Sequence, residues 1–187
     1  CAREALALQA ATGDCRELGN AMSLSAAAHA HAGDAAAALK WQQQTLALWQ
    51  RLGHPWSESV AHLNLAGLAL DSGTPEVARA HLQRVLALLP RVDSEYVGVH
   101  LLEVAADWAA CVGLDEESVR LDAAAAVQLQ RTGQRSAADP QRQARAERAQ
   151  AGLGPAACLA LQRAGSALPY RDALALVARL LASTAAG

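Results

Sequence analysis

Glycines that recur every 40 residues constrain the fold of this chain more than any other feature. They form two interleaved series, and one aspartate takes a glycine's place in the second. The first series is Gly33, Gly73 and Gly113, and the second is Gly13, Gly53, Asp93 and Gly133. Glycine often follows the last turn of a helix, because it adopts the left-handed backbone conformation at little cost. Two series with one period therefore predict a repeated pair of helices.

Between these positions, apolar residues recur at helical spacing. The segments predict three helical hairpins, with helices at residues 14–32, 34–52, 55–72, 74–90, 93–112 and 114–132. Start signals agree with these limits. Asp34 follows a glycine, Thr74 precedes Pro75, and acidic residues fill positions 115–117. Alanine makes up about a quarter of the chain and phenylalanine is absent, so strand-forming residues are scarce and an all-α fold is expected.

The 40-residue register also predicts which side chains lie inside each hairpin. Ala26, Ala66 and Ala106 occupy one position in three successive first helices, where a small side chain lets two helices approach closely. Two neighbouring positions are assigned to the same interior. They are Met22, His62 and Leu102, and Ser25, Leu65 and Ala105.

A paired-helix repeat with small residues at the crossing and a Gly-Asp or Ser-Gly-Thr turn resembles the tetratricopeptide repeat family. The resemblance is strongest from Asn64-Leu65-Ala66 through Gly73 to Ala78 and covers residues 14–133, although the period is longer than usual for that family. It implies a right-handed α-solenoid of three antiparallel hairpins. Residues 1–13 read as the second helix of a preceding repeat, so we expect the chain to be a piece of a longer protein.

The segment after Gly133 resembles a narrower group. Asp139-Pro140 begins an arginine-rich helix, which is followed by Leu153-Gly154, a short helix to Gly165, Leu168-Pro169 and a last helix with Asp172-Ala173-Leu174. This order is similar to the C-terminal end of large bacterial signal-transduction ATPases, including LuxR-type transcriptional regulators. The resemblance implies that residues 134–187 form capping helices and that the parent protein binds ATP and controls transcription.

Stacked hairpins of this kind line a concave groove with their first helices. Residues spaced by three or four along each first helix face that groove. The candidate groove residues are Asn20, Ser23 and His31 from the first, Leu63, Gly67 and Asp71 from the second, and His100, Glu103 and Asp107 from the third. Such a groove suits an apolar peptide or helix with an Arg or Lys near Glu103 and Asp107. The alternatives are a solvated face, or a groove filled by a neighbouring domain or by the chain's own tail.

Several other ligands are disfavoured. A peptide's C-terminal carboxylate calls for basic groups, and the predicted groove has no basic residue. The formal net charge is −2, so no nucleic-acid partner is expected, and the arginines of residues 131–148 are interpreted as a solvated helix face.

An exposed tryptophan would serve as an interface anchor. Trp49 and Trp56 flank one turn and are expected to pack together.

The sequence shows no signature of an enzyme. Phosphate-binding, dinucleotide-binding and nucleophile-elbow motifs are missing. His100, Glu103 and Asp107 share a helix face, but no second cluster of ligands accompanies them, so no metal, cofactor or catalytic residue is assigned. The cysteines are widely spaced and fit free thiols in the cytoplasm. No apolar run is long enough for a membrane span.

We therefore predict a regulatory helical-repeat domain that binds other proteins and performs no catalysis. Its expected partners are a protein or peptide, an ATPase domain of the same parent chain, or a second copy of itself. Two alternatives stay open. The curved interior could sense a small-molecule inducer, or the chain could be a freestanding assembly scaffold.

Overall fold

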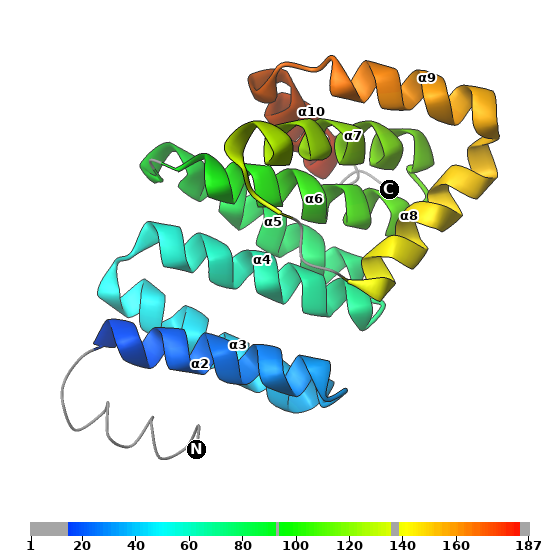
Figure 1. Cartoon of the computed structure of the whole chain (residues 1–187). Coiled ribbons are helices and arrows are strands. Elements are labelled where there is room, and N and C mark those ends of the chain that lie inside the picture. The colour runs from blue at the N-terminus through cyan, green and yellow to red at the C-terminus, as the bar shows by residue number, and fades with distance from the viewer. Residues whose placement is uncertain (1–14, 93, 136–138, 184–187) are drawn as a thin grey trace.

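The protein is built from helices stacked in pairs (Figure 1). A computed structural model describes residues 15–92, 94–135 and 139–183, and every regular element in these ranges is helical. The first hairpin joins α2 (Cys15–His31) to α3 (Ala35–Leu52), the second joins α4 (Pro55–Asp71) to α5 (Pro75–Leu88), and the third joins α6 (Glu95–Cys111) to α7 (Asp115–Thr132). The 3-10 helix η1 (Leu89–Arg91) follows α5. The predicted all-α fold is confirmed, and the six predicted ranges differ from these helices by a few residues at their ends.

The glycines of both series end helices as predicted, within the described residues. Gly33, Gly73 and Gly113 have positive φ angles of 78°, 69° and 78°. Asp34 caps the start of α3, where its side chain accepts a hydrogen bond from the backbone N–H of Ala37. Thr74 precedes α5 but does not cap it through its side chain, since its hydroxyl donates to the carbonyl of Ala69 instead. Gly13, Asp93 and the helix predicted over residues 1–13 lie outside the described residues.

The interior positions read from the repeat are buried. Ala26, Ala66 and Ala106 lie at the core of their hairpins, and the positions held by Met22, His62 and Leu102 are buried with them. The ring of His62 lies beside that of His81, with 2.9 Å between their Nδ1 atoms. Burial, together with His81 and Arg84, lowers the pKa of His62 to about 4, so this imidazole is neutral at pH 7. A polar residue therefore fills an apolar site of the repeat by pairing with a second histidine.

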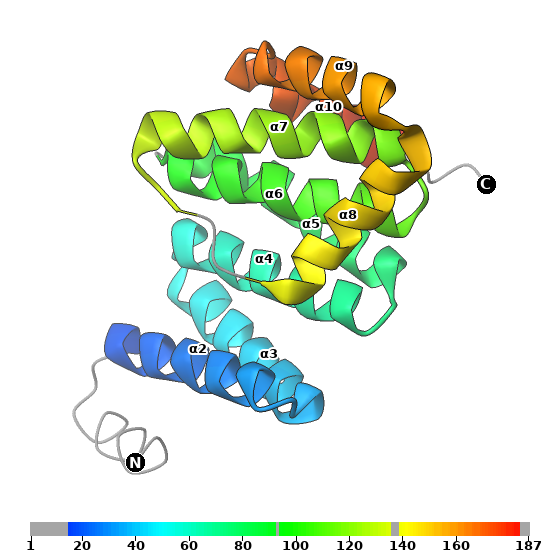
Figure 2. The ribbon, with the colours of Figure 1, turned by 45° about the vertical axis from the view of Figure 1, so that its right-hand side comes forward.

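Three further helices follow the hairpins. They are α8 (Pro140–Leu153), α9 (Pro155–Ser166) and α10 (Tyr170–Ser183). The helix α10 contributes Ala173, Val177 and Leu181 to the main hydrophobic core, beside residues of the second and third hairpins. The helix α9 packs on α7, and α8 packs on α6 and α7. In Figure 2, α8 crosses in front of α6 at an angle to the stacked helices.

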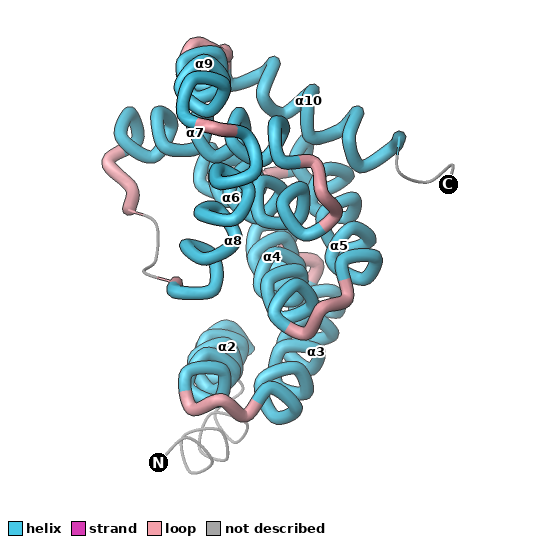
Figure 3. Tube along the Cα trace, turned by 90° about the vertical axis from the view of Figure 1, so that its right-hand side faces the viewer, coloured by secondary structure: helices cyan, strands magenta, loops and turns pink. Residues whose placement is uncertain are grey.

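The helices of the array lie on two sides of the molecule. Viewed from the side in Figure 3, α3 and α5 lie on one side of the molecule, whereas α2 and α8 lie on the other. The helix α4 packs against α6, but α2 makes its main contacts with α3. The first helices therefore form a concave side with α2 at one edge and α8 near the other.

Two glycines inside helices should respond oppositely to alanine. A Cβ on Gly165 would collide with the backbone of Arg120 in α7, whereas a Cβ on Gly67 would meet no atom within 4 Å. We expect Gly165→Ala to lower the free energy of unfolding by about 1–3 kcal/mol through overpacking. Gly67→Ala should raise it by about 0.5–1 kcal/mol, because alanine favours the helix. Urea unfolding followed by circular dichroism measures both, and equal effects would contradict this packing.

Candidate functional site

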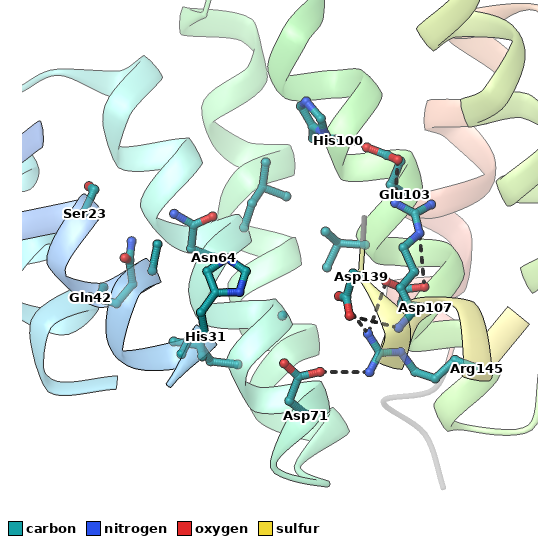
Figure 4. Close-up of a pocket in the computed structure, with 18 residues that line it drawn as sticks. Ser23, His31, Gln42, Asn64, Asp71, His100, Glu103, Asp107, Asp139 and Arg145 are labelled. Atoms are coloured by element: carbon teal, nitrogen blue, oxygen red, sulfur yellow. Dashed lines mark hydrogen bonds and ion pairs between the residues drawn. The ribbon is translucent and has the colours of Figure 1, made fainter. Parts of the chain in front are cut away.

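A cavity of about 340 Å³ opens on the concave side, between α2, α4, α6 and α8. Figure 4 shows that residues from both ends of the repeat point toward it. Eight of the nine candidate groove residues line it: Ser23, His31, Leu63, Gly67, Asp71, His100, Glu103 and Asp107. Asn20 is exposed on α2 and lies outside the lining. The 40-residue register therefore brings together side chains from three helices at one cavity.

The cavity also contains residues that the sequence analysis did not select. Asn64 projects from α4 and is exposed, and Gln42 reaches the cavity from α3, where it donates a hydrogen bond to the carbonyl of Ala61. Asp139, Arg142 and Arg145 come from the start of α8. Asn64 follows the predicted Leu63 by one position, so a slightly wider helix face would have included it. Nothing in the local sequence assigns the α8 residues to this place.

The acidic end of the predicted groove is occupied by arginines of the same chain. Arg142 donates a hydrogen bond to Glu103 and another, of 3.0 Å, to Asp122. Arg145 donates one of 2.9 Å to Asp71. The interpretation of residues 131–148 as a solvated helix face is wrong for these two arginines, because the Arg145 residue is 5% exposed and the Arg142 side chain is 18% exposed. The expectation that the groove holds no basic residue is wrong for the same reason.

Asp107 lies between the two arginines. Its carboxylate is 3.7 Å from Nε of Arg142 and 3.5 Å from Nη2 of Arg145. Burial raises the pKa of Asp107 to about 6, against the opposing pull of Arg142 and Arg145, and nearby Asp122 raises it further. The cluster holds five carboxylates, those of Asp71, Glu103, Asp107, Asp122 and Asp139, against its two guanidinium groups. It also has an open flank, since the side chains of Asp71 and Asp139 are 34% and 42% exposed.

An aromatic row extends from His100, whose Nδ1 atom is 2.5 Å from Oε2 of Glu103 in the acidic cluster. His100 lines the cavity and contacts the ring of Tyr96 edge to face, with 4.3 Å between ring centroids. Tyr96 in turn contacts Trp56, with 5.7 Å between centroids, and each of these two residues is 39% exposed. The expectation that Trp49 packs on Trp56 is wrong, because Trp49 is buried against His54. Exposed aromatic side chains of this kind often anchor protein partners.

The comparisons with known proteins agree with the fold. Residues 17–91 match the model of the tetratricopeptide repeat family. The match spans the first two hairpins and confirms the predicted resemblance there, so the all-helical array is a tetratricopeptide-like helical repeat. Tetratricopeptide repeats generally mediate protein–protein interactions and are typically non-catalytic. No curated protein and no solved structure matches the chain.

Two further findings concern metal binding and membrane-spanning helices. Within residues 15–92, 94–135 and 139–183, no group of three or more His, Cys, Asp or Glu side chains is placed to hold a metal ion. None of the described helices combines the length and apolar composition needed to cross a lipid bilayer.

Removing one arginine of the cluster should loosen α8. Arg145→Gln removes the arginine partner of Asp71 and leaves Asp107 with Arg142 alone, and breaking a buried ion pair costs about 3 kcal/mol. We expect the amide hydrogens of α8 to exchange about 100-fold faster in this variant, while α4 and α5 change less. Hydrogen exchange with mass spectrometry measures the effect. Arg148→Gln is the matched control, because Arg148 is exposed one turn later, and equal exchange in the two variants would contradict the ion-pair account.

Proposed function

We propose that the chain is a protein-binding domain that holds a segment of a partner along the concave side of its helical repeat. The cavity between α2, α4, α6 and α8 is the observation that carries this proposal, since it exposes groups of different chemistry within one groove. Asn64 offers an amide that both donates and accepts hydrogen bonds, as a peptide backbone requires. Trp56 and Tyr96 lie outside the cavity lining, next to His100, and offer apolar surface for a side chain of the partner.

The geometry refines the kind of segment that fits. Glu103 is 2% exposed and already bonded to Arg142, so it is not accessible to a partner's cation in the way the sequence suggested. The lining that remains for a bound segment includes the small residues of α2, the exposed Asn64 and the open space at Gly67. The best occupant is therefore a peptide with an apolar or aromatic residue for the Trp56–Tyr96 row and polar groups toward α8.

Gly67→Leu tests this proposal, because Gly67 lines the cavity and a Cβ there meets no atom within 4 Å, so a larger side chain can extend into the open space. Peptides selected from a random display library on the wild-type chain should lose at least about tenfold in affinity for Gly67→Leu, which is about 1.4 kcal/mol. Fluorescence anisotropy with the labelled peptides measures this. Ala80→Leu adds the same side chain at an exposed position of α5 outside the cavity and should bind like wild type. Equal binding by all three proteins would contradict a groove site.

A small-molecule sensor is the second candidate function, and the size of the cavity favours it. Pockets for small ligands begin at about 300 Å³. A ligand that binds only the folded state raises the melting temperature. If the cavity is a sensor, a metabolite library should produce a shift that Gly67→Leu abolishes, whereas a peptide-binding domain should respond to peptides alone.

We propose further that the chain belongs to a larger bacterial regulator of transcription in the cytoplasm. The resemblance of residues 139–174 to the ends of signal-transduction ATPases supports this, and α8, α9 and α10 follow one another in the order that the resemblance implies. In this proposal residues 14–133 are three repeats and residues 134–187 cap them. The ATPase domain of the parent, or a second copy of the chain, is then a natural partner. A coding sequence that encodes only more repeats upstream would leave a freestanding scaffold instead, whereas a P-loop and a helix-turn-helix would support the regulator.

A further inference from the structure

The helix α8 is held in place differently from the other helices. Its sequence, PQRQARAERAQAGL, has no apolar stripe, and its buried residues are Arg145 and Ala149. By contrast, α10 buries Leu176, Val177 and Leu181. A helix that buries little apolar surface gains little from the hydrophobic effect. Ion pairs therefore dominate the attachment of α8 to the repeat.

The surface under α8 is complementary to arginine. Asp71 on α4, Glu103 and Asp107 on α6, and Asp122 on α7 bind the two guanidinium groups. Arg142 and Arg145 are three residues apart, so they project from one face of a helix. The carboxylates come from three different helices of the repeat. A ligand of this surface is therefore recognised by the charge of its cations and by the spacing between them.

Several observations indicate that the occupant can be exchanged. The cavity borders the same ion pairs, and Gly67 leaves open space next to Asp71. Four carboxylates of the repeat face two arginines of α8, and His100 contacts one of them, Glu103, so the acidic groups of this surface outnumber the arginines. A cation that enters the cavity meets Asp71 and Asp139, whose side chains are the more exposed ones beside Arg145. It can therefore replace the contacts of Arg145 before α8 leaves.

We propose that α8 is a built-in occupant of a binding surface for arginine-bearing helices, and that a partner helix with two arginines three residues apart replaces it. This inference rests on the proposed concave binding site. It names the class of partner that binds the part of that site next to α8. Release of α8 exposes Asp71, Glu103, Asp107 and Asp122, and the partner's guanidinium groups restore their counter-charge. The binding of such a partner is thereby coupled to movement of α8.

A synthetic peptide of residues 139–153 is the probe that tests this exchange. The wild-type chain should bind the labelled peptide weakly, because its own α8 competes at a high effective concentration. The full-length double variant Arg142→Gln/Arg145→Gln frees the surface and should bind at least about tenfold more tightly. A peptide carrying the same two changes should not bind, while a peptide carrying Arg148→Gln should bind normally. Binding should weaken as salt is raised.

A second measurement covers the case in which the double variant does not fold. A saturating concentration of the peptide should accelerate amide exchange in α8 of the wild-type chain, which requires no substitution in the protein. Unchanged exchange there, or equal binding of the peptide to a folded double variant and to wild type, would overturn the inference. Library peptides whose affinity falls in Gly67→Leu would in that event still support the concave binding site. The two proposals can therefore fail separately.

Discussion

Glu103 and Asp107 lose most of their contact with water inside the concave face of the repeat, and buried carboxylates are stable only beside positive charge. The repeat's first helices offer no cation to this face, so Arg142 and Arg145 of α8 supply it. That requirement positions α8 across α6 and α7, and α9 follows it directly along the chain. Pairing the two acids therefore shapes the wall of the cavity as well as the path of the C-terminal segment.

The concave side has three regions of different chemistry, and the ion-pair cluster is one of them. The aromatic row of Trp56 and Tyr96 can contribute apolar contact area, the open space at Gly67 admits a side chain, and the ion-pair cluster responds to charge. Buried ion pairs contribute little net stability, since the cost of desolvation offsets much of their attraction. A helix held mainly by such pairs is well suited to exchange, whereas α10 is fixed by leucine and valine side chains in the core.

Local and periodic features of the sequence predicted most of the fold. Gly33, Gly73 and Gly113 marked helix ends through backbone conformation, and the alanines at 26, 66 and 106 marked helix crossings through size. The same 40-residue repeat predicted which side chains of α2, α4 and α6 face the cavity. The docking of α8 could not be predicted this way, because Glu103 and Arg142 are 39 residues apart and their pairing depends on how the third hairpin turns back. The signal available was indirect: Asp122 stands 40 residues after Leu82, which is buried in the second repeat, and two arginines share one face of α8.

A double-mutant cycle between Arg145 and Asp107 tests the central claim most directly. The free energies of unfolding of wild type, Arg145→Gln, Asp107→Asn and the double variant give the coupling between the two side chains without contributions from the rest of the chain. We expect a coupling of at least about 1.5 kcal/mol, the lower end of the range for close charge pairs across protein interfaces. Additive effects, with a coupling below about 0.5 kcal/mol, would contradict the account in which buried acids of the repeat hold α8 in place.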